Sequence, residues 1–356
     1  MEYLESRPEI ETSPVVSAKK AALIYVSEDA PGYQRRPRGR GFCYLAPKGR
    51  FVKDKDLLAR FKHLHIPPAW ENVWISIESD CHIQATGRDE RGRKQYIYHP
   101  RWNEIRNSAK FDRLVPFAKT LPKMRERVNR DLRREIFSRE TVLAFVVSLL
   151  EHTLFRIGNE EYRRENHSFG LTTLLDRHLR VSGSVLHLKF RGKWGKIQKV
   201  DLCDRRLARL AKKYQELPGQ ELLKYQDSSG GLKVIESGDV NEYLGEITGG
   251  DFTAKDFRTW GGTVSAANEL FRLGPAASDH EIKRNIIQAI RNTASRLGNT
   301  PAVCRKYYVA PQIIEAYVDG NLFKAMSKDA GENGGNRFNL DWEERAVVDL
   351  LKNSHL

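Results

Sequence analysis

The hydrophobic pattern of this 356-residue chain changes its period near residue 112, and this change limits the folds that the chain can adopt. Before that point, short apolar runs alternate with polar residues, as in residues 95–98. Alternation with a period of two is typical of strands that bury one face. After it, apolar residues recur at the three- and four-residue spacing of an amphipathic helix. The clearest helical stripe consists of Leu121, Met124, Val128 and Leu132.

Local signals predict several helices and one hairpin in the second part of the chain. Residues that can cap a helix N-terminus precede helical patterns at Ser138, Ser278 and Thr300. Gly298 is placed to end the helix that Ser278 begins. The other expected elements are a β-hairpin formed by residues 186–190 and 197–202, and a final helix over residues 340–352.

These patterns together predict an α+β protein with a small β-rich N-terminal domain and a larger, mostly α-helical domain that contains a β-hairpin. The length agrees with about two domains at roughly 150 residues each. We expect residues 1–34 to form a flexible lead, residues 35–112 the β-rich domain and residues 113–356 the helical domain.

The chain is strongly basic, and the excess charge is concentrated in one stretch. Its 60 Lys and Arg residues and 46 Asp and Glu residues give a net charge of +14 at pH 7. Residues 35–137 alone hold 25 basic and 12 acidic side chains, a net charge of +13. Within this stretch, the arginines from Arg35 to Arg40 predict a basic arm that could lie along phosphates. The expected partner is therefore a polyanion, most simply nucleic acid.

Several classes of protein are disfavoured by what the sequence lacks. No apolar run approaches the roughly 18 residues of a membrane span, and the first residues lack the layout of a signal peptide. The four cysteines are far apart and form no CxxC pair, which argues against a disulfide scaffold or a cysteine zinc site and favours a reducing cytoplasm. There is no P-loop, HExxH motif or EF-hand loop, so neither bound ATP nor a protein-held metal is expected.

The candidate catalytic residues are basic residues and tyrosines in distinctive surroundings. Arg156 and Arg258 could hold the non-bridging oxygens of a phosphodiester and stabilise a pentacoordinate phosphorane. Lys193, in a turn, could protonate a leaving alkoxide. Tyr307 or Tyr308 could attack the phosphorus, because cationic neighbours help a phenol to ionise. Each residue alone also has an ordinary role, as a helix-dipole partner, a solvated side chain or a packing residue.

Four sequence blocks that contain these residues resemble the small type IB DNA topoisomerases, the poxvirus-like group that also occurs in bacteria. The blocks occur in the family's order, and the resemblance runs from about residue 35 to about residue 318. It implies a β-rich N-terminal domain and a mostly helical catalytic domain that form a C-shaped clamp around duplex DNA. The blocks are FRIGNEEYRRENHSFGLTTL (155–174), LKFRGK (188–193), AKDFRTWGG (254–262) and GNTPAVCRKYYV (298–309).

The resemblance also implies catalytic roles for individual residues. Arg156 and Arg258 correspond to the family's two catalytic arginines, and Lys193 corresponds to its general-acid lysine. Lys255, one helical turn before Arg258, falls on an assisting position.

The nucleophile falls on Tyr308 rather than on Tyr307. The family places its nucleophile nine residues after a side chain that contacts the phosphate, and this chain has Asn299 at that distance from Tyr308. The viral pattern has histidine where Asn299 stands, although bacterial members resemble this chain. An asparagine can donate a hydrogen bond to a phosphate oxygen but cannot carry charge, so the role is expected in an altered form.

Further residues match positions that contact DNA in the family. In the N-terminal domain they belong to the segment that touches the major groove, where strand alternation would place two tyrosines on one face. In the catalytic domain they lie near the backbone of the cleaved strand. The predicted DNA contacts are Arg93, Gln95, Tyr96, Tyr98, Asn166 and Ser168.

The activity that the resemblance implies is relaxation of supercoiled duplex DNA by a monomer. The tyrosine forms a 3′-phosphotyrosyl bond and releases a 5′-hydroxyl, the broken strand rotates about its partner, and the 5′-hydroxyl reverses the reaction. No ATP, metal or other cofactor is implied. A membrane partner is not expected, and the place of action would be the nucleoid in the cytoplasm.

Two other functions fit part of the pattern. Tyrosine recombinases use a similar Arg/Lys/Arg/Tyr set, but they favour His-x-x-Arg around the second arginine, where this chain has Lys255-Asp-Phe-Arg258. Their tetramers usually exchange a C-terminal helix, a part that residues 340–352 could play. A non-catalytic architectural DNA-binding protein would need only the basic stretch, and it would leave the catalytic set unexplained.

Overall fold

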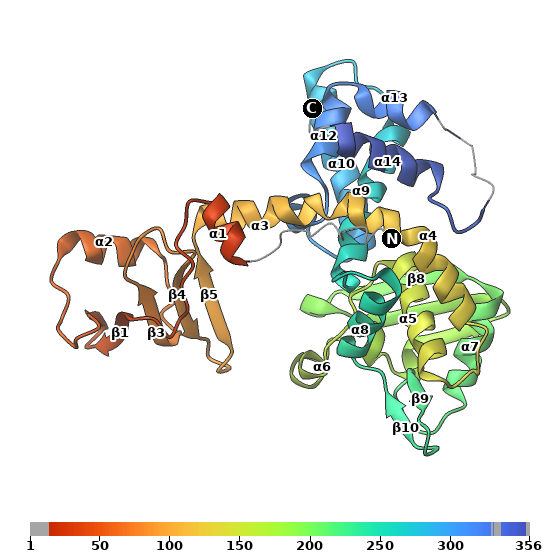
Figure 1. Ribbon diagram of the computed structural model, residues 1–356, viewed down its shortest axis with the longest axis horizontal. Coiled ribbons are helices and arrows are strands. Elements are labelled where there is room, and N and C mark those ends of the chain that lie inside the picture. Colours follow the sequence, from red (N-terminus) through yellow and green to blue (C-terminus); the bar gives the residue numbers. More distant parts are fainter. Residues whose placement is uncertain (1–13, 329, 331–335, 354–356) are drawn as a thin grey trace, which may run out of the picture. The chain divides into compact units, whose positions relative to one another are not determined.

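The computed structural model describes residues 14–328, 330 and 336–353, and the chain forms two compact units (Figure 1). Unit 1 ends at Asp112, and unit 2 begins at Arg113. Unit 1 contains a five-stranded sheet, whereas unit 2 contains most of the helices together with two smaller sheets. The α+β prediction is therefore confirmed.

Unit 1 is built on an antiparallel sheet with the strand order β2-β1-β3-β4-β5. Its core forms where Phe61 of α2 packs against Val73, Ile75 and Ala85 of the sheet. The strands are β1 (Gly32–Arg38), β2 (Gly41–Leu45), β3 (Glu71–Ser76), β4 (Ile83–Arg88) and β5 (Lys94–Tyr98), and the helices are α1 (Pro14–Lys20), α2 (Lys55–His63) and α3 (Pro100–Asp112).

The structure corrects the expected N-terminal lead. Apolar residues between Ala18 and Leu23 form a small core with Trp102 of α3, and β1 begins at Gly32 inside the sheet. Residues 14–34 therefore belong to unit 1, while the rest of the expected lead lies outside the described residues. The packing of this short apolar patch on a distant helix is what ties these residues to unit 1.

The expected basic arm is a strand. The residues from Arg35 to Arg38 lie in β1 and pair with β2. Arg35 is only 7% exposed, and its guanidinium donates hydrogen bonds to the carbonyl oxygens of Ile66 at 3.2 Å, Pro67 at 3.0 Å and Trp70 at 2.6 Å. Arg35 thus fixes the loop before β3 instead of lying along a phosphate. Its partners are more than 30 residues away in sequence, which no local pattern could reveal.

Unit 2 is organised around α5 (Arg139–Thr153), a helix that is buried on all sides. Every residue from Thr141 to Leu150 is buried, as is typical of a helix that is apolar all round. The helix packs against α4 (Leu114–Asp131), α8 (Ser237–Thr248) and α9 (Ala254–Leu273). Ser138 caps it as predicted, because its hydroxyl accepts a hydrogen bond from the backbone N–H of Thr141 at 3.3 Å.

The predicted hairpin is part of a three-stranded antiparallel sheet with the order β6-β7-β8. Its strands are β6 (Leu179–Ser182), β7 (Val185–Arg191) and β8 (Ile197–Cys203). The sequence patterns did not predict a further two-stranded sheet of β9 (Lys224–Gln226) and β10 (Leu232–Val234), since strands of three residues are too short to show alternation.

The predicted caps of the later helices are confirmed. The Ser278 hydroxyl accepts from the backbone N–H of Glu281 at 3.3 Å, Gly298 ends the same helix with a left-handed φ of 63°, and Thr300 caps the next one. The remaining helices of unit 2 are α4 (Leu114–Asp131), α6 (Glu160–Asn166), α7 (Arg205–Gln215), α8 (Ser237–Thr248), α9 (Ala254–Leu273), α10 (Asp279–Leu297), α11 (Pro301–Tyr307), α12 (Pro311–Val318), α13 (Asn321–Lys328) and α14 (Trp342–Asn353).

Candidate active site

Helix α9 holds Arg258 in the interior of unit 2. The helix starts at a cap in which the Asp256 carboxylate accepts from the backbone N–H of Thr253 at 2.8 Å. Arg258 lies about one turn later and is only 4% exposed. Its guanidinium donates to the carbonyl oxygen of Leu297 at 3.0 Å and to that of Leu154. These carbonyls lie at the C-terminal ends of α10 and α5, where the helix dipole attracts a cation.

The same helix holds Tyr308, which directly follows α11. The centre of the Tyr308 ring lies 5.0 Å from Cζ of Arg258. The Thr263 hydroxyl of α9 donates to the carbonyl oxygen of Tyr308 at 3.3 Å and accepts from the N–H of Ala310 at 3.2 Å. The close approach requires Gly262, since a Cβ there would lie 2.5 Å from the Tyr308 carbonyl oxygen. One helix therefore fixes both the arginine and the tyrosine backbone.

The surroundings of Tyr308 lower the pKa of its phenol from the ordinary value of 10. Burial of the phenol raises this pKa, but nearby positive charges outweigh burial and favour the phenolate. These charges belong, in decreasing order of effect, to Arg258, Arg156 and Lys255. Burial in turn lowers the pKa of Arg258 to about 10, against the attraction of Tyr308. A phenol that ionises more readily is a better nucleophile at neutral pH.

Arg156 lies just after the chain leaves α5 through a tight turn. Leu154 ends the helix with a left-handed φ of 55°. The backbone around Gly170 then passes close to the backbone of residues 156–158. A Cβ on Gly170 would lie 2.5 Å from Cα of Gly158 and 2.6 Å from the carbonyl oxygen of Arg156. That carbonyl accepts from the backbone N–H of Leu171 at 2.9 Å. The two glycines of this sequence block therefore allow the crossing that orients Arg156.

Asn299 is linked to Arg156 and holds a buried amide nitrogen beside it. Its side-chain oxygen accepts from the Arg156 guanidinium, so its amide nitrogen, Nδ2, is the group left over. Asn299 is 7% exposed, and within the described residues Nδ2 is buried without a hydrogen-bond partner. A buried N–H of this kind is costly unless an acceptor arrives from outside. An oxygen of a bound phosphate fits that requirement.

The β7–β8 turn is attached to Asn299 through Lys196, which no sequence motif marks. Nζ of Lys196 donates to the backbone carbonyl of Asn299 at 2.9 Å, and the Gly192 N–H donates to the Lys196 carbonyl at 2.8 Å. Lys193 is exposed on this turn, with Nζ 5.7 Å from the centre of the Trp194 ring. The turn that carries Lys193 is thereby attached to the segment of Asn299.

Contacts pair Arg156 with Asn299 and Arg258 with Tyr308, and the charges of both arginines act on Tyr308, so four of the six predicted catalytic residues are brought together. Lys255 is exposed at the start of α9 and acts on Tyr308 through its charge, and Lys193 lies on the attached turn. Tyr307 is also exposed, with Nζ of Lys306 5.4 Å from the centre of its ring. The four united residues are Arg156, Arg258, Asn299 and Tyr308.

In unit 1, Tyr96 and Tyr98 lie on one face of β5, as predicted. Their rings are stacked, with centres 5.7 Å apart and planes inclined by 8°, and they are 41% and 37% exposed. The Asp89 carboxylate accepts from Arg93 at 2.8 Å and from Gln95 at 3.0 Å. Asp89, which the sequence analysis missed, therefore orients two of the predicted contacts beside an open aromatic surface.

Asn166 and Ser168 lie at and just beyond the end of α6. The Ser168 hydroxyl donates to the backbone carbonyl of Asn166 at 3.4 Å, and His167 between them has a left-handed φ of 48°. Both residues are half-buried on the segment that leads to the crossing at Gly170. Both residues therefore lie on the segment that connects Arg156 to Gly170, where the backbone passes close to the turn after α5.

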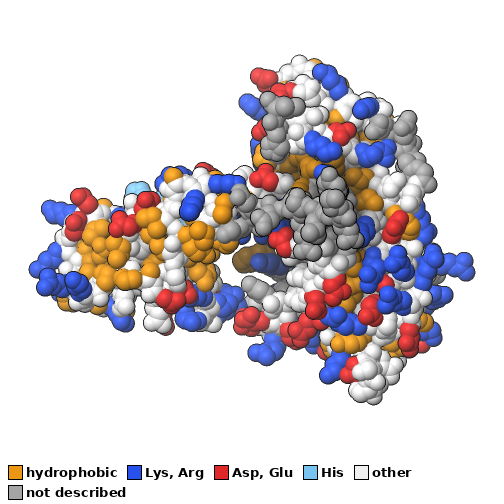
Figure 2. All heavy atoms as spheres, viewed as in Figure 1, with side chains coloured by type: hydrophobic (Ala, Val, Ile, Leu, Met, Phe, Trp, Pro, Cys, Tyr) orange, Lys and Arg blue, Asp and Glu red, His pale blue; other side chains and the backbone are white. Residues whose placement is uncertain are grey.

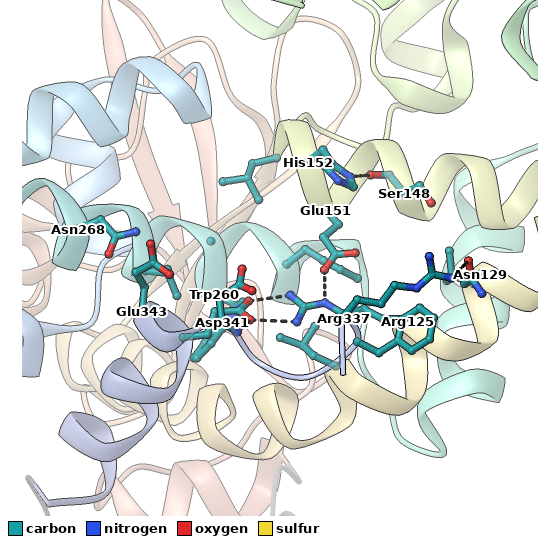
Figure 3. A pocket seen from close by; sticks show the side chains of 18 of the residues that line it. Arg125, Asn129, Ser148, Glu151, His152, Trp260, Asn268, Arg337, Asp341 and Glu343 are labelled. Carbon is teal, nitrogen blue, oxygen red and sulfur yellow. Dashed lines mark hydrogen bonds and ion pairs between the residues drawn. The ribbon is translucent and has the colours of Figure 1, made fainter. Parts of the chain in front are cut away.

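A cavity of about 560 Å³ beside α9 is lined by an ionic network of buried and half-buried side chains (Figure 3). Arg125 of α4 pairs with Glu151 of α5 at 2.7 Å and with Glu344 of α14 at 2.8 Å. The indole N–H of Trp260 donates to Glu344 at 3.2 Å. Burial lowers the pKa of Arg125, but the two carboxylates outweigh burial and raise it. Because Trp260 lies two residues after Arg258, the network connects α14 to the helix that holds the candidate site.

We expect Arg125→Ala to destabilise unit 2 by about 3 kcal/mol, because it leaves the buried carboxylate of Glu344 and the half-buried carboxylate of Glu151 without their cation. Denaturant unfolding measures the change. Arg272→Ala is the matched control, since Arg272 pairs with Glu269 on the surface and its side chain is 75% exposed, and its effect should stay within about 0.5 kcal/mol. Equal effects of the two substitutions would contradict a structural role for the network.

Comparisons with known proteins agree with the geometry. The family model for the catalytic core of eukaryotic DNA topoisomerase I matches residues 99–329, and that for the N-terminal domain of bacterial DNA topoisomerase IB matches residues 41–89. DNA topoisomerase 1B of Acanthamoeba polyphaga mimivirus is 32% identical over 298 residues, which cover 82% of this chain and 88% of the relative. The chain belongs to the type IB DNA topoisomerases.

As a type IB DNA topoisomerase, the chain is an enzyme that acts on DNA. DNA topoisomerase 1B of vaccinia virus (strain Copenhagen) is 27% identical over 276 residues, which cover 75% of this chain and 82% of that protein. DNA topoisomerase 1 of Mycosarcoma maydis is 22% identical over 261 residues, but these cover only 25% of that longer protein. In the part of this topoisomerase that the structure describes, no helix has the length and apolar character of a membrane span.

Proposed function

We propose that this chain relaxes supercoiled duplex DNA through a covalent tyrosine intermediate, with Tyr308 as the nucleophile. The observation that supports this most is the position of the Tyr308 phenol beside Arg258, in a cationic cluster that lowers its pKa. Its oxygen attacks the phosphorus of a backbone phosphodiester. The bond from that oxygen to phosphorus forms, the P–O5′ bond breaks, and the phenol proton passes to solvent. The product is a 3′-phosphotyrosyl ester.

The cluster around Tyr308 supplies the donors that this step needs. Arg156 and Arg258 bind the non-bridging oxygens and offset the charge of the phosphorane, and Nδ2 of Asn299 donates to one of these oxygens. Lys193 gives a proton to O5′ as the P–O5′ bond breaks. We assign Lys255 the supporting role of keeping Tyr308 acidic.

The ester stores the energy of the broken phosphodiester. The free 5′-hydroxyl end can rotate about the intact strand and then attack the phosphotyrosyl ester, which restores the original bond and releases Tyr308. The cycle is balanced without an energy source from outside. Because one chain supplies every group in it, we propose that the enzyme acts as a monomer.

Duplex DNA is the substrate that the charges and aromatic residues favour. Figure 2 shows Lys and Arg side chains on the visible face of each unit. We propose that Tyr96 and Tyr98 contact the duplex, that unit 2 binds the same duplex as in the clamp that the resemblance implies, and that Asn166 and Ser168 lie near the cleaved strand. Binding through phosphate contacts should weaken steeply as salt is added. The nucleoid is then the proposed place of action.

The direct test is relaxation of negatively supercoiled plasmid in EDTA without any nucleotide. We expect complete relaxation, together with a protein–DNA adduct that detergent traps during turnover. A requirement for a divalent metal or for ATP would contradict the proposal. Trapping also separates the proposal from a purely architectural DNA-binding protein, which would give no adduct.

The final helix packs within its own unit in this structure. Helix α14 packs against α4, α9, α12 and α13 of its own unit, and Glu344 is held by Arg125. The side chains of Ala346, Val347 and Leu351 are buried there. No observation therefore favours a recombinase over a topoisomerase, and recombination between two paired sites would contradict our proposal.

We expect Lys255→Ala to displace the pH profile of single-turnover cleavage to higher pH. Lys255 is one of the charges that lower the pKa of Tyr308, so its loss raises that pKa and leaves less phenolate at each pH below it. Lys255→Arg keeps the charge and should keep the profile. A uniform loss of rate at all pH values in Lys255→Ala would instead indicate a structural role.

A further inference from the structure

The tip of the β7–β8 hairpin exposes a tryptophan. Trp194 is 85% exposed, the largest fraction among the exposed large hydrophobic side chains of the described residues, and Ile197 beside the same turn follows with 61%. The backbone of Trp194 is left-handed, with φ 63° and ψ 23°. The left-handed backbone conformation costs a residue other than glycine roughly 1–3 kcal/mol of conformational energy. Backbone strain and exposed apolar area therefore coincide at Trp194. Such a coincidence is common where a side chain meets a ligand.

The hairpin holds this tip firmly. The N–H of Gly195 donates to the carbonyl of Gly192 at 3.1 Å, which closes the turn around Trp194. At the base of the turn, the ring of Phe190 packs edge-on against Phe155 with centres 5.0 Å apart. Phe155 directly precedes Arg156, so the strand that supports Trp194 is anchored beside the arginine cluster. Trp194 is thus presented to the solvent by a braced turn.

The charges around the tip indicate what covers the indole. Five exposed cations and no acidic residue lie between positions 189 and 199, which suits a polyanion rather than an apolar protein surface. Nζ of Lys193 lies 5.7 Å from the centre of the Trp194 ring, within the range of a cation–π contact. The five cations are Lys189, Arg191, Lys193, Lys196 and Lys199.

The distance between Lys193 and the indole limits which part of the DNA Trp194 can contact. If Nζ of Lys193 lies at a hydrogen-bond distance of about 2.8 Å from O5′ and 5.7 Å from the indole centre, the indole lies within about 8.5 Å of O5′. That is the size of one nucleotide. The apolar surface nearest to O5′ is the C–H face of the deoxyribose to which it belongs.

We propose that Trp194 is a positioning residue whose indole packs on the deoxyribose of the nucleotide that leaves with the 5′-hydroxyl, and that this contact places the ammonium of Lys193 on O5′. The inference rests on the proposed function, in which Lys193 donates its proton to O5′ while the P–O5′ bond breaks and the bond from Tyr308 to phosphorus forms. Trp194 itself takes no part in the bond changes.

The test compares two leaving groups. One duplex has the ordinary bridging 5′-oxygen at the cleavage site, and the other has a bridging 5′-sulfur, whose thiolate leaves without a proton because a thiol has a pKa of about 8.5. Single-turnover cleavage is measured for the wild type, Trp194→Ala, Trp194→Gly, Trp194→Phe, Ile197→Ala and Lys193→Ala, and stability is measured by denaturant unfolding. Duplex affinity is measured in parallel.

We expect Trp194→Ala to cleave the oxygen duplex about 30-fold more slowly, which is less than the roughly 10²–10⁴-fold that a general acid contributes because Lys193 itself is still present, and to cleave the sulfur duplex at nearly the wild-type rate. Trp194→Phe should retain most of the rate, and Ile197→Ala should match the wild type. Trp194→Gly removes the same contact but suits the left-handed backbone, so it should lose rate without losing stability.

The outcomes separate this inference from the proposed function. An equal defect of Trp194→Ala on both duplexes, or no defect on either, would overturn the positioning role alone, provided that sulfur rescues Lys193→Ala. If sulfur does not rescue Lys193→Ala, the general-acid role of Lys193 fails, and the positioning role fails with it. A rate loss in Trp194→Ala that follows only from weaker binding would also overturn it.

Discussion

Tyr308→Phe is expected to abolish the formation of covalent protein–DNA adduct, with a loss of cleavage rate of at least about 10⁴-fold. The substitution removes only the phenol oxygen that would attack phosphorus. The ring can keep its place over Arg258, and Thr263 still holds the backbone carbonyl of residue 308. Duplex affinity should therefore change by no more than about threefold, since phosphate contacts dominate it. Detergent trapping on a labelled duplex measures the adduct, and a filter or gel assay measures binding.

Tyr307→Phe is the matched control, because it removes the same atom from the neighbouring residue. Tyr307 is exposed and lies on the last turn of α11, with its ring beside Lys306. We expect it to form adduct at the wild-type rate. If Tyr307→Phe loses the adduct while Tyr308→Phe retains it, the assignment of the nucleophile is off by one residue.

Gly262→Ala should slow cleavage by about 100-fold while DNA binding persists, since a misplacement of about 1 Å can have that effect. The new Cβ would lie 2.5 Å from the Tyr308 carbonyl oxygen and 3.2 Å from its Cβ, so the segment that bears the nucleophile must move away from α9. Helix propensity favours alanine over glycine by about 1 kcal/mol, so the expected effect has the opposite sign to the intrinsic preference of the helix. Single-turnover cleavage and duplex affinity are the measurements.

Gly245→Ala is the control for that preference. Gly245 lies inside α8, where a Cβ would meet the carbonyl oxygen of Gly250 at 3.5 Å, an ordinary contact. It should leave the cleavage rate unchanged and should not lower stability. Wild-type cleavage by Gly262→Ala would show that the approach of α9 to Tyr308 does not position the nucleophile.

Local signals predicted the parts of the fold that depend on near neighbours. Ser138, Ser278 and Thr300 each cap the helix that they precede, because the acceptor and its N–H donor are only three residues apart. The unbroken apolar run of α5 likewise indicates a helix buried on all sides. The β7–β8 hairpin follows from alternation around a short turn.

Interactions between distant segments were beyond that reasoning. Arg35 belongs to a segment with the basic composition of a DNA-binding arm. Its guanidinium is nevertheless hydrogen-bonded inside unit 1 to three backbone carbonyls that lie more than 30 residues away in sequence. Asp89 was not singled out, although it orients Arg93 and Gln95. Neither partner set is marked by any periodicity, since both depend on how the chain folds back on itself.

The candidate site shows the same limit more sharply. Arg156 and Asn299 are 143 residues apart in sequence, and only the resemblance to a family suggested that they act together. The supporting residues Gly262, Thr263 and Lys196 have no chemical signature of their own. A pair of adjacent glycines in the third sequence block was the one visible sign that backbone approaches closely there.

The arrangement of α9 has a consequence for how the length of this chain can vary. One short stretch of α9 contacts three different segments. Its contacts are Arg258 with the end of α10, Trp260 with α14, and Gly262 with the backbone of Tyr308. Each added or deleted residue turns a helix by about 100° and shifts it by about 1.5 Å. A single insertion within this stretch would therefore break at least one of the three alignments, whatever residue is inserted. Chimeras between relatives should exchange α9 and α11 as one piece, and place length changes in outlying turns such as that between β9 and β10.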